Sequence, residues 1–213
     1  MTPPHATRFP YRAACAVFGL AALLPLAAQA AATPVQVLDA RGRPLADAVV
    51  YATPAGARPA PAAPPTTVAI DQIDREFVPL VSVIQTGTNV RFPNKDDVEH
   101  DIYSFSPAKR FEIKLYSGVP AKPVLFDKPG LVVLGCNIHD SMVAYVLVVE
   151  TPYFGRTDKD GRVSFENLPA GSYRVAAWHY KMRDPNAQPV STAQVAAGGA
   201  SPALKFTLTT EGN

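Results

Sequence analysis

Short runs of β-branched and aromatic residues alternate along this chain with Gly, Pro, Asn and Asp, and this alternation restricts its fold more than any other feature. Beyond residue 30, no helical periodicity extends further than a turn or two, and no apolar run reaches the length of a membrane span. Of the 213 residues, 47% are hydrophobic and 18% are charged, so the chain has the apolar content that a packed core requires. The sequence therefore predicts an all-β globular protein.

The N-terminal segment has the pattern of a secretory signal peptide. Arg8 and Arg12 precede an Ala- and Leu-rich run, which ends with Ala28-Gln29-Ala30, the small-x-small pattern of a signal-peptidase site. The run is shorter than the ~20 apolar residues that span a bilayer and contains Pro25, so cleavage is favoured over an uncleaved anchor. We expect residues 1–30 to be removed on export to the periplasm, which leaves no membrane span.

Removal of this signal changes the charge and the cysteine content. The whole chain has 20 Lys and Arg against 18 Asp and Glu, and loss of Arg8 and Arg12 leaves 18 of each, so the formal charge falls from +2 to zero. A neutral chain gives no reason to expect nucleic acid as a partner. Cys136 becomes the only cysteine, so no intramolecular disulfide can form. In an oxidising compartment we expect such a thiol to be buried, reactive or metal-bound.

The rest of the chain divides into four predicted segments. Residues 33–60 contain two strands joined by a turn, and residues 61–66 belong to a Pro-rich linker. Residues 67–152 contain a series of short strands whose spacing suits a two-sheet sandwich, and residues 153–213 add further strands and turns. This order is compatible with a central domain that is inserted between the outer pieces, and also with a plain tandem.

The two outer pieces resemble a known family. The outer pieces are similar to the carboxypeptidase-regulatory-like, transthyretin-type β-sandwich, and the similar segments are Val37–Asp39, Gly42–Leu45, Asp47–Val50, Thr157–Arg162 and Leu168–Tyr173. In that family the two halves are nearly contiguous in sequence, whereas here residues 67–152 lie between them. The resemblance therefore implies that the central domain is inserted into the small sandwich, and the tandem arrangement remains the alternative.

Residues with metal-binding chemistry concentrate in one short loop. Cys136, His139 and Met142 follow one another with Cys-x-x-His-x-x-Met spacing between two apolar runs, and His100 ends a polar turn further upstream. In a sandwich, two such loops can meet at one end. A thiolate, two imidazoles and a weakly bound thioether are the ligand set of electron-transfer copper sites. The pattern thus indicates a copper site that is suited to electron transfer rather than to binding a substrate.

Residues 67–150 resemble the cupredoxins, the blue type 1 copper proteins, and in particular the amicyanin- and plastocyanin-like members. The motifs in common are an Asn-x-x-x-x-x-His that ends at His100, the Phe126–Gly130 turn, and the Cys-x-x-His-x-x-Met loop followed by the apolar Val146–Val149. The resemblance implies a Greek-key β-sandwich that binds one type 1 copper ion. The ligands that it assigns are His100, Cys136, His139 and Met142.

The chain departs from this family in two places. The ligand loop contains Asn137, Asp140 and Ser141, where amicyanin-like proteins have prolines and an aromatic residue that form an apolar docking surface. Asp101 follows the first ligand, where the family usually has an asparagine that supports the ligand loops by hydrogen bonding. We therefore expect the partner surface and the support of the site to differ from the family pattern.

Each predicted ligand also has a simpler interpretation. Cys136 alone could be a buried inert thiol, and Met142 a core residue. His100 and His139 could be surface histidines, but these interpretations leave the ordered spacing unexplained. Zinc is disfavoured because a thioether is not among its usual ligands, and a binuclear copper site would need a second cysteine in the loop. His179, at the end of an apolar run, is expected to be structural.

We expect a periplasmic one-electron carrier without enzymatic activity of its own. The resemblance suggests a c-type haem protein or a periplasmic, amine-oxidising dehydrogenase as the redox partner, as in methylamine utilization. The alternative function is periplasmic storage or delivery of copper. An enzyme with Cys136 as nucleophile and His100 as base is disfavoured, because the sequence offers no evident group to stabilise an oxyanion.

Overall fold

The computed structural model describes residues 32–56, 66–120, 122–166, 168–196 and 201–211. Every regular element among these residues is a β-strand, so the predicted all-β fold class is confirmed. The strands are β1 (Ala32–Asp39), β2 (Val49–Pro54), β3 (Thr67–Ala69), β4 (Asp71–Ile73), β5 (Glu76–Val78), β6 (Val81–Gln85), β7 (Thr88–Arg91), β8 (His100–Ser106), β9 (Lys109–Tyr116), β10 (Val124–Phe126), β11 (Gly130–Gly135), β12 (Val143–Val149), β13 (Phe154–Arg156), β14 (Arg162–Glu166), β15 (Gly171–Trp178), β16 (Val190–Val195) and β17 (Leu204–Leu208).

Two predicted features of the sequence fall outside the described residues. They are the signal peptide (1–30) and all but the last residue of the linker (61–66). Within the part of the chain that is described, no helix is long and apolar enough to cross a membrane.

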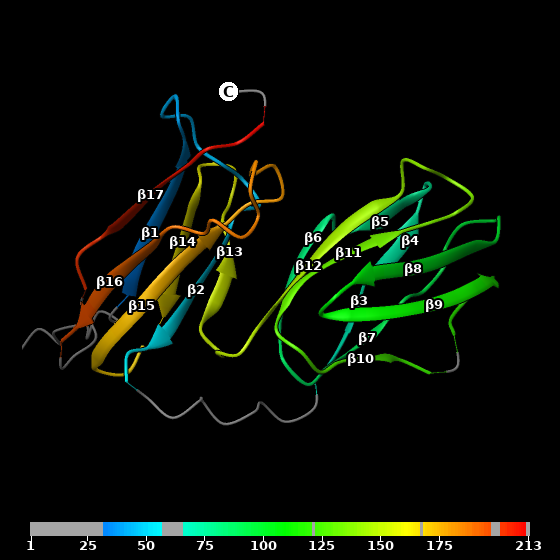
Figure 1. Cartoon of the computed structure of the whole chain (residues 1–213), viewed down its shortest axis with the longest axis horizontal. Helices are drawn as coiled ribbons and strands as arrows, with labels where there is room; N and C mark the ends of the chain where they lie inside the picture. Colours follow the sequence, from blue (N-terminus) through cyan, green and yellow to red (C-terminus); the bar gives the residue numbers. More distant parts are fainter. Residues whose placement is uncertain (1–31, 57–65, 121, 167, 197–200, 212–213) are drawn as a thin grey trace, which may run out of the picture.

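Strands β3 to β12 build one lobe of the molecule, on the right of Figure 1. The larger sheet has the order β6-β12-β11-β8-β9, the smaller sheet has the order β10-β7-β3, and β4 and β5 form a separate hairpin. Neighbouring strands are antiparallel, except that β6 runs parallel to β12 and β3 runs parallel to β7. Both sheets contribute to one buried cluster, which includes Phe92, Ile102, Phe126, Leu134 and Val146. The lobe is therefore a β-sandwich.

Strands from both outer parts of the chain build the second lobe, on the left of Figure 1. One sheet has the order β14-β1-β17, with β1 antiparallel to β14 and parallel to β17. The other sheet has the order β13-β2-β15-β16. The chain thus leaves this lobe after β2, forms β3 to β12, and returns at β13. The domain limits given above remain predictions.

Strand β12 links the two lobes because both of its faces are buried. Successive side chains of a strand point to opposite sides of the sheet. Ala144, Val146 and Val148 face the core of the right-hand lobe, whereas Leu147 and Val149 belong to a second cluster that extends into the left-hand lobe. The left-hand lobe contributes to this second cluster Val49, Trp178 and Met182, among others. The lobes therefore share a core and are not joined by a linker alone.

His179 lies at the edge of the left-hand core and is 3% exposed. Its Nε2 donates to the carbonyl of Ala46 over 3.1 Å, and its Nδ1 accepts the backbone N–H of Lys181 over 3.2 Å. One ring nitrogen acts as donor and the other as acceptor, which is the pattern of a neutral imidazole. Burial lowers the pKa of His179 below its ordinary value of 6.5. These contacts give His179 a structural role.

The shared core predicts cooperative unfolding. Because Leu147 and Val149 are buried by residues of the other lobe, loss of either lobe exposes apolar surface on the remaining one. Copper-free protein should unfold in a single calorimetric transition, with equal calorimetric and van 't Hoff enthalpies. Two separate transitions would contradict a shared core.

The buried neutral His179 predicts a loss of stability in mild acid. The unfolded chain binds a proton at His179 near pH 6.5 but the folded chain resists it, so the free energy of unfolding should decrease as the pH falls below about 6.5. Urea unfolding of copper-free protein at about pH 7.5 and about pH 5.5 measures this decrease. His179→Gln should reduce the difference between the two pH values, and an unchanged difference would contradict the assignment.

Candidate metal centre

His100 is the first residue of β8, and its side chain is completely buried. Its Nε2 lies 2.7 Å from a carboxylate oxygen of Asp96. Because a carboxylate accepts hydrogen bonds, this contact places the ring proton on Nε2. The other ring nitrogen, Nδ1, is buried and has no hydrogen-bond partner. His100 thus presents an unused lone pair inside the protein.

The carboxylate of Asp96 is itself held by the β4–β5 hairpin. Its two oxygens accept the backbone N–H groups of Asp74 (2.6 Å) and Arg75 (3.0 Å), the two turn residues of that hairpin. Both turn residues have positive φ, 55° and 62°, as a two-residue β-hairpin turn requires. Burial disfavours ionisation of Asp96, but these N–H groups and His100 outweigh burial and lower the pKa of Asp96. The His100 ring is therefore anchored to an ionised carboxylate.

Cys136 directly follows β11 and is 3% exposed. The next residue, Asn137, donates twice to Asp101: its backbone N–H reaches Oδ1 over 2.6 Å and its side-chain amide reaches Oδ2 over 2.5 Å. Asp101 is the neighbour of His100 on β8. One carboxylate therefore ties the loop of Cys136 to the strand of His100. The departure from the family pattern at position 101 still supplies a hydrogen bond between the ligand-bearing segments.

His139 completes a compact group with these two residues. The potential ligand atoms of His100, Cys136 and His139 all lie within 4.8 Å of one another. The two imidazole rings are 5.0 Å apart between centroids, with an interplanar angle of 65°. The Nδ1 atom of His139 is also buried without a partner. Among the described residues, this is the group of three or more His, Cys, Asp or Glu side chains arranged to hold a metal ion.

The donor set of this group fits copper. Two buried imidazole nitrogens without hydrogen bonds are costly, because buried polar atoms are normally paired. A cation with an affinity for imidazole and thiolate would pair both nitrogens and bind Cys136 as the thiolate. His100 from one segment and Cys136 and His139 from the loop after β11 thus come together in a form that a copper ion would complete.

Met142, the fourth predicted ligand, is 1% exposed. A turn brings it back into the protein, and its backbone N–H donates to the carbonyl of His139 over 2.9 Å. The side chain belongs to the same buried cluster as Cys136. Its part as an axial ligand remains a prediction.

Tyr116 lies next to the group of His100, Cys136 and His139, and the sequence does not predict this neighbour. It lies opposite His100 in the β8–β9 ladder. Its hydroxyl donates to the carbonyl of Phe92 over 2.8 Å and accepts a hydrogen bond from the amide of Gln72. Burial raises the pKa of Tyr116, the hydrogen bond from Gln72 acts in the opposite direction, and the nearby Cys136 side chain raises the pKa further. The phenol therefore stays protonated beside the group.

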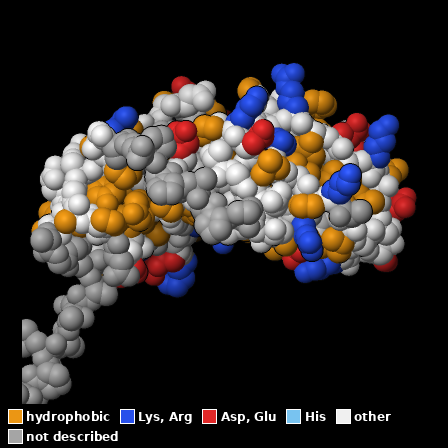
Figure 2. All heavy atoms as spheres, turned by 90° about the horizontal axis from the view of Figure 1, so that it is seen from below, with side chains coloured by type: hydrophobic (Ala, Val, Ile, Leu, Met, Phe, Trp, Pro, Cys, Tyr) orange, Lys and Arg blue, Asp and Glu red, His pale blue; other side chains and the backbone are white. Residues whose placement is uncertain are grey.

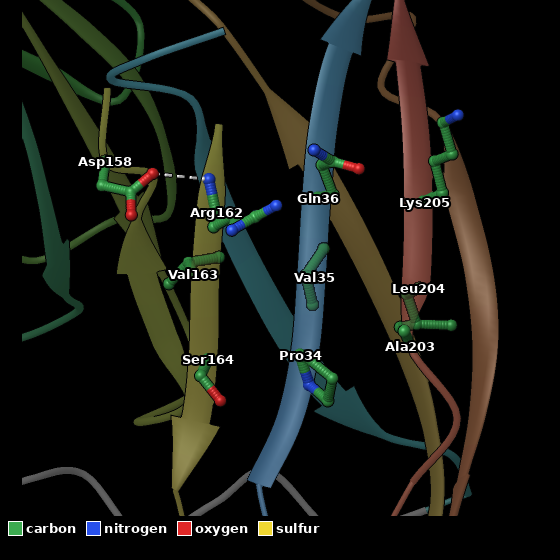
Figure 3. Close-up of a pocket in the computed structure, with 10 residues that line it drawn as sticks. All are labelled: Pro34, Val35, Gln36, Asp158, Arg162, Val163, Ser164, Ala203, Leu204 and Lys205. Atoms are coloured by element: carbon green, nitrogen blue, oxygen red, sulfur yellow. Dashed lines mark hydrogen bonds between the residues drawn. The ribbon is translucent and has the colours of Figure 1, made fainter. Parts of the chain in front are cut away.

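A separate hollow lies on the other lobe, away from the metal-binding side chains. It is formed over β14, β1 and β17, and the Asp158 carboxylate at its edge accepts the backbone N–H of Arg162 over 2.9 Å (Figure 3). Seen from below in Figure 2, hydrophobic side chains gather on this lobe, whereas Lys and Arg side chains are spread over the other. None of the residues that line the hollow is a histidine or a cysteine, so it has no part in the metal centre.

The chain is similar to solved structures that include copper proteins. No family model matches the chain, and no curated protein matches it. Among solved structures, it is similar to a Cu-containing nitrite reductase (NirK) from Thermus scotoductus SA-01, with 27% identity and a TM-score of 0.38 over 46% of this chain and 26% of that one. It is also similar to a purple cupredoxin from Nitrosopumilus maritimus (23% identity, TM-score 0.34, 39% of this chain and 99% of that one).

A reduced mutant of amicyanin is a third similar structure, with 16% identity and a TM-score of 0.37 over 46% of this chain and 99% of that one. The chain thus spans about a quarter of the length of the nitrite reductase that it matches and nearly all of the two smaller proteins. The transthyretin-type resemblance of the outer pieces remains a prediction.

The bonds of Asp101 predict that this residue supports metal binding. Asp101→Ala removes both acceptors of Asn137 and loosens the loop that carries Cys136, so copper should bind roughly 10- to 100-fold more weakly. Competition against a chromophoric copper chelator measures the change. Asp101→Asn keeps one acceptor oxygen and should retain most of the affinity, and an alanine variant with unchanged affinity would contradict the assignment.

Proposed function

We propose that this protein is a periplasmic type 1 copper protein that carries one electron at a time between redox partners. The observation that supports this proposal most strongly is the gathering of the His100, Cys136 and His139 ligand atoms within 4.8 Å, with both Nδ1 atoms buried and unpaired. One thiolate and two imidazoles, with a weak thioether, suit Cu(I) and Cu(II) alike. Copper bound there would supply a reversible one-electron couple.

The role of the protein chain is to keep the copper ligands in place while the charge of the copper ion changes. Asp96 fixes the orientation and the tautomer of His100. Asp101 fixes Asn137 and, through it, the start of the ligand loop. Asp96 and Asp101 hold these groups within a packed sandwich, in which Cys136 and Met142 are buried. A site that moves little on oxidation suits electron transfer, and we assign no catalytic residue and no enzymatic turnover to it.

His139 is the ligand that we propose as the point of electron entry. It is half-buried, whereas its loop neighbours Asn137, Ile138 and Asp140 are exposed. A redox partner that docks on this loop would come closer to the centre here than through the completely buried His100. A c-type haem protein or a periplasmic dehydrogenase would be a partner of the required kind.

Spectroscopy of the copper-loaded protein tests the proposal. With Cu(II) added, we expect an intense thiolate-to-copper band in the visible spectrum and a narrow copper hyperfine splitting in electron paramagnetic resonance. Cys136→Ser should abolish both features because it removes the thiolate. Only a pale Cu(II) spectrum in the unmodified protein would contradict a type 1 site.

Electrochemistry separates electron transfer from copper storage or delivery. A carrier should give fast, reversible oxidation and reduction and should retain its copper through many cycles, because the hydrogen bonds of Asp96 and Asp101 restrain the ligands. Slow cycling, with ready release of Cu(I) to a chelator, would instead favour storage or delivery of the metal.

A further inference from the structure

The hollow over β14, β1 and β17 has the size of a small-molecule binding site. Its volume is about 640 Å³, which falls within the roughly 300–1,000 Å³ of typical ligand pockets. Half of the ten residues that line it are apolar, namely Pro34, Val35, Val163, Ala203 and Leu204. The hollow has no part in the metal centre, so its role has to be inferred from its own residues.

The register of the strands places short side chains at the centre of the hollow. Val35 on β1 is buried in the left-hand core, so Pro34 before it and Gln36 after it face outward. Ser164 on β14 lies opposite Pro34. On the other side of β1, Ala203 is exposed just before β17 and also lines the hollow. Pro34, Ser164 and Ala203 together form a low, mostly apolar surface, which we call the shelf.

Longer side chains with hydrogen-bond donors border the shelf. Gln36 pairs with Arg162 on β14 and with Lys205 on β17, so the three residues lie in one row across the sheet (Figure 3). Arg162 and Lys205 are exposed, and in Figure 3 the Arg162 side chain extends from β14 toward β1. A guanidinium, an amide and an ammonium group can all donate hydrogen bonds, and two of them are charged. The row therefore suits an anionic group such as a carboxylate.

The two cations of this row are available to such an anion. Within the described ranges, neither the guanidinium of Arg162 nor the ammonium of Lys205 takes part in a salt bridge. The segments 1–31 and 197–200, which precede β1 and β17 in sequence, contain no Asp or Glu. An anion that binds at this row would therefore not have to displace an ion pair within the chain.

Two carboxylates near the hollow limit the charge of a ligand. Asp158 lines the edge, and its Oδ1 accepts the backbone N–H groups of Arg162 and Asp160, each over 2.9 Å. The bond from Arg162 lowers the pKa of Asp158 most, against a smaller effect of burial, so the carboxylate is ionised. One carboxylate against two cations leaves the lining with a formal charge of +1. Glu166 is exposed on β14, two positions beyond Ser164 and at the end of the shelf away from the row. A second anionic group would be repelled there.

We propose that this hollow binds a small carboxylate with an apolar body, the carboxylate over Gln36 and the apolar body on the shelf. Neighbouring strands are about 5 Å apart, so a carboxylate over Gln36 is within reach of the long side chains of both Arg162 and Lys205. The apolar body would cover Pro34 and Ser164. This site goes beyond the proposed function, because binding there does not require copper.

Titration of the protein with 2-naphthoate tests the proposal, with 2-naphthylmethanol as the uncharged analogue. In two-dimensional NMR, 2-naphthoate should shift the amide signals of Gln36, Ser164 and Lys205. The alcohol should shift the same signals but bind roughly 10-fold more weakly, because it lacks the charge that the row recognises. Equal affinity for the acid and the alcohol, or shifts confined to another part of the surface, would overturn the proposal.

Arg162→Gln and Lys205→Gln test the contribution of the two cations. Each should weaken 2-naphthoate roughly 3- to 10-fold, and the double variant should bind the acid no better than the alcohol. Arg174→Gln is the matched control, because Arg174 is an exposed cation on β15 of the other sheet. It should leave the affinity unchanged. A loss as large as that of the two row variants would show a general charge effect and overturn the site.

Ser164→Phe tests the shelf separately from the charges. A phenyl ring at this exposed position of β14 would fill the hollow while both cations remain, so binding of the acid and of the alcohol should both be lost. An unchanged affinity for 2-naphthoate in this variant, with an unchanged thermal unfolding midpoint, would overturn the proposal. Shifts of the same amides by an aspartate-rich peptide, with none by 2-naphthoate, would overturn the choice of a small molecule.

Discussion

The hydrogen bonds that Asp101 accepts from Asn137 hold together the two segments from which the metal centre is built. His100 is the first residue of β8, whereas Cys136 and His139 lie in the loop between β11 and β12. The two segments are far apart in sequence, so the chain connection alone does not bring their ligand atoms together. Asp101 joins the segments next to both His100 and Cys136, and Asp96 fixes the ring that must face the loop. With the ligands held in this way, a metal ion would meet a site that is already formed, which is the condition for tight and selective binding.

The rest of the fold keeps these supports rigid. Asp96 is positioned by the tight β4–β5 turn, and the loop of Cys136 lies between two strands of the five-stranded sheet. The second lobe covers the outer face of β12 and so buries an apolar surface that a sandwich on its own would expose. The same strand therefore contributes to two cores, and the stability of the right-hand lobe depends on strands contributed by both outer parts of the chain.

The sequence predicts the fold class well, and it points to three side chains that the fold brings together, because both depend on local patterns. Alternation of apolar runs and turn residues predicts the strands, and the Cys-x-x-His-x-x-Met spacing brings attention to a single loop. The supports are different. That Asp96 faces His100 depends on the path of a turn, and that Tyr116 lies opposite His100 depends on the register of β9 against β8. Asp96 and His100 are only four residues apart, but neither pairing involves an unusual residue type or spacing, so no local pattern predicts them.

The central claim is that one copper ion is held jointly by His100, Cys136 and His139, and X-ray absorption of the copper-loaded protein tests it most directly. We expect a copper coordination shell of one short sulfur and two imidazole nitrogens, which stays nearly the same in the oxidised and reduced protein. In Cys136→Ser, the sulfur at the short distance should be lost. A shell of nitrogen and oxygen alone in the unmodified protein would contradict the account.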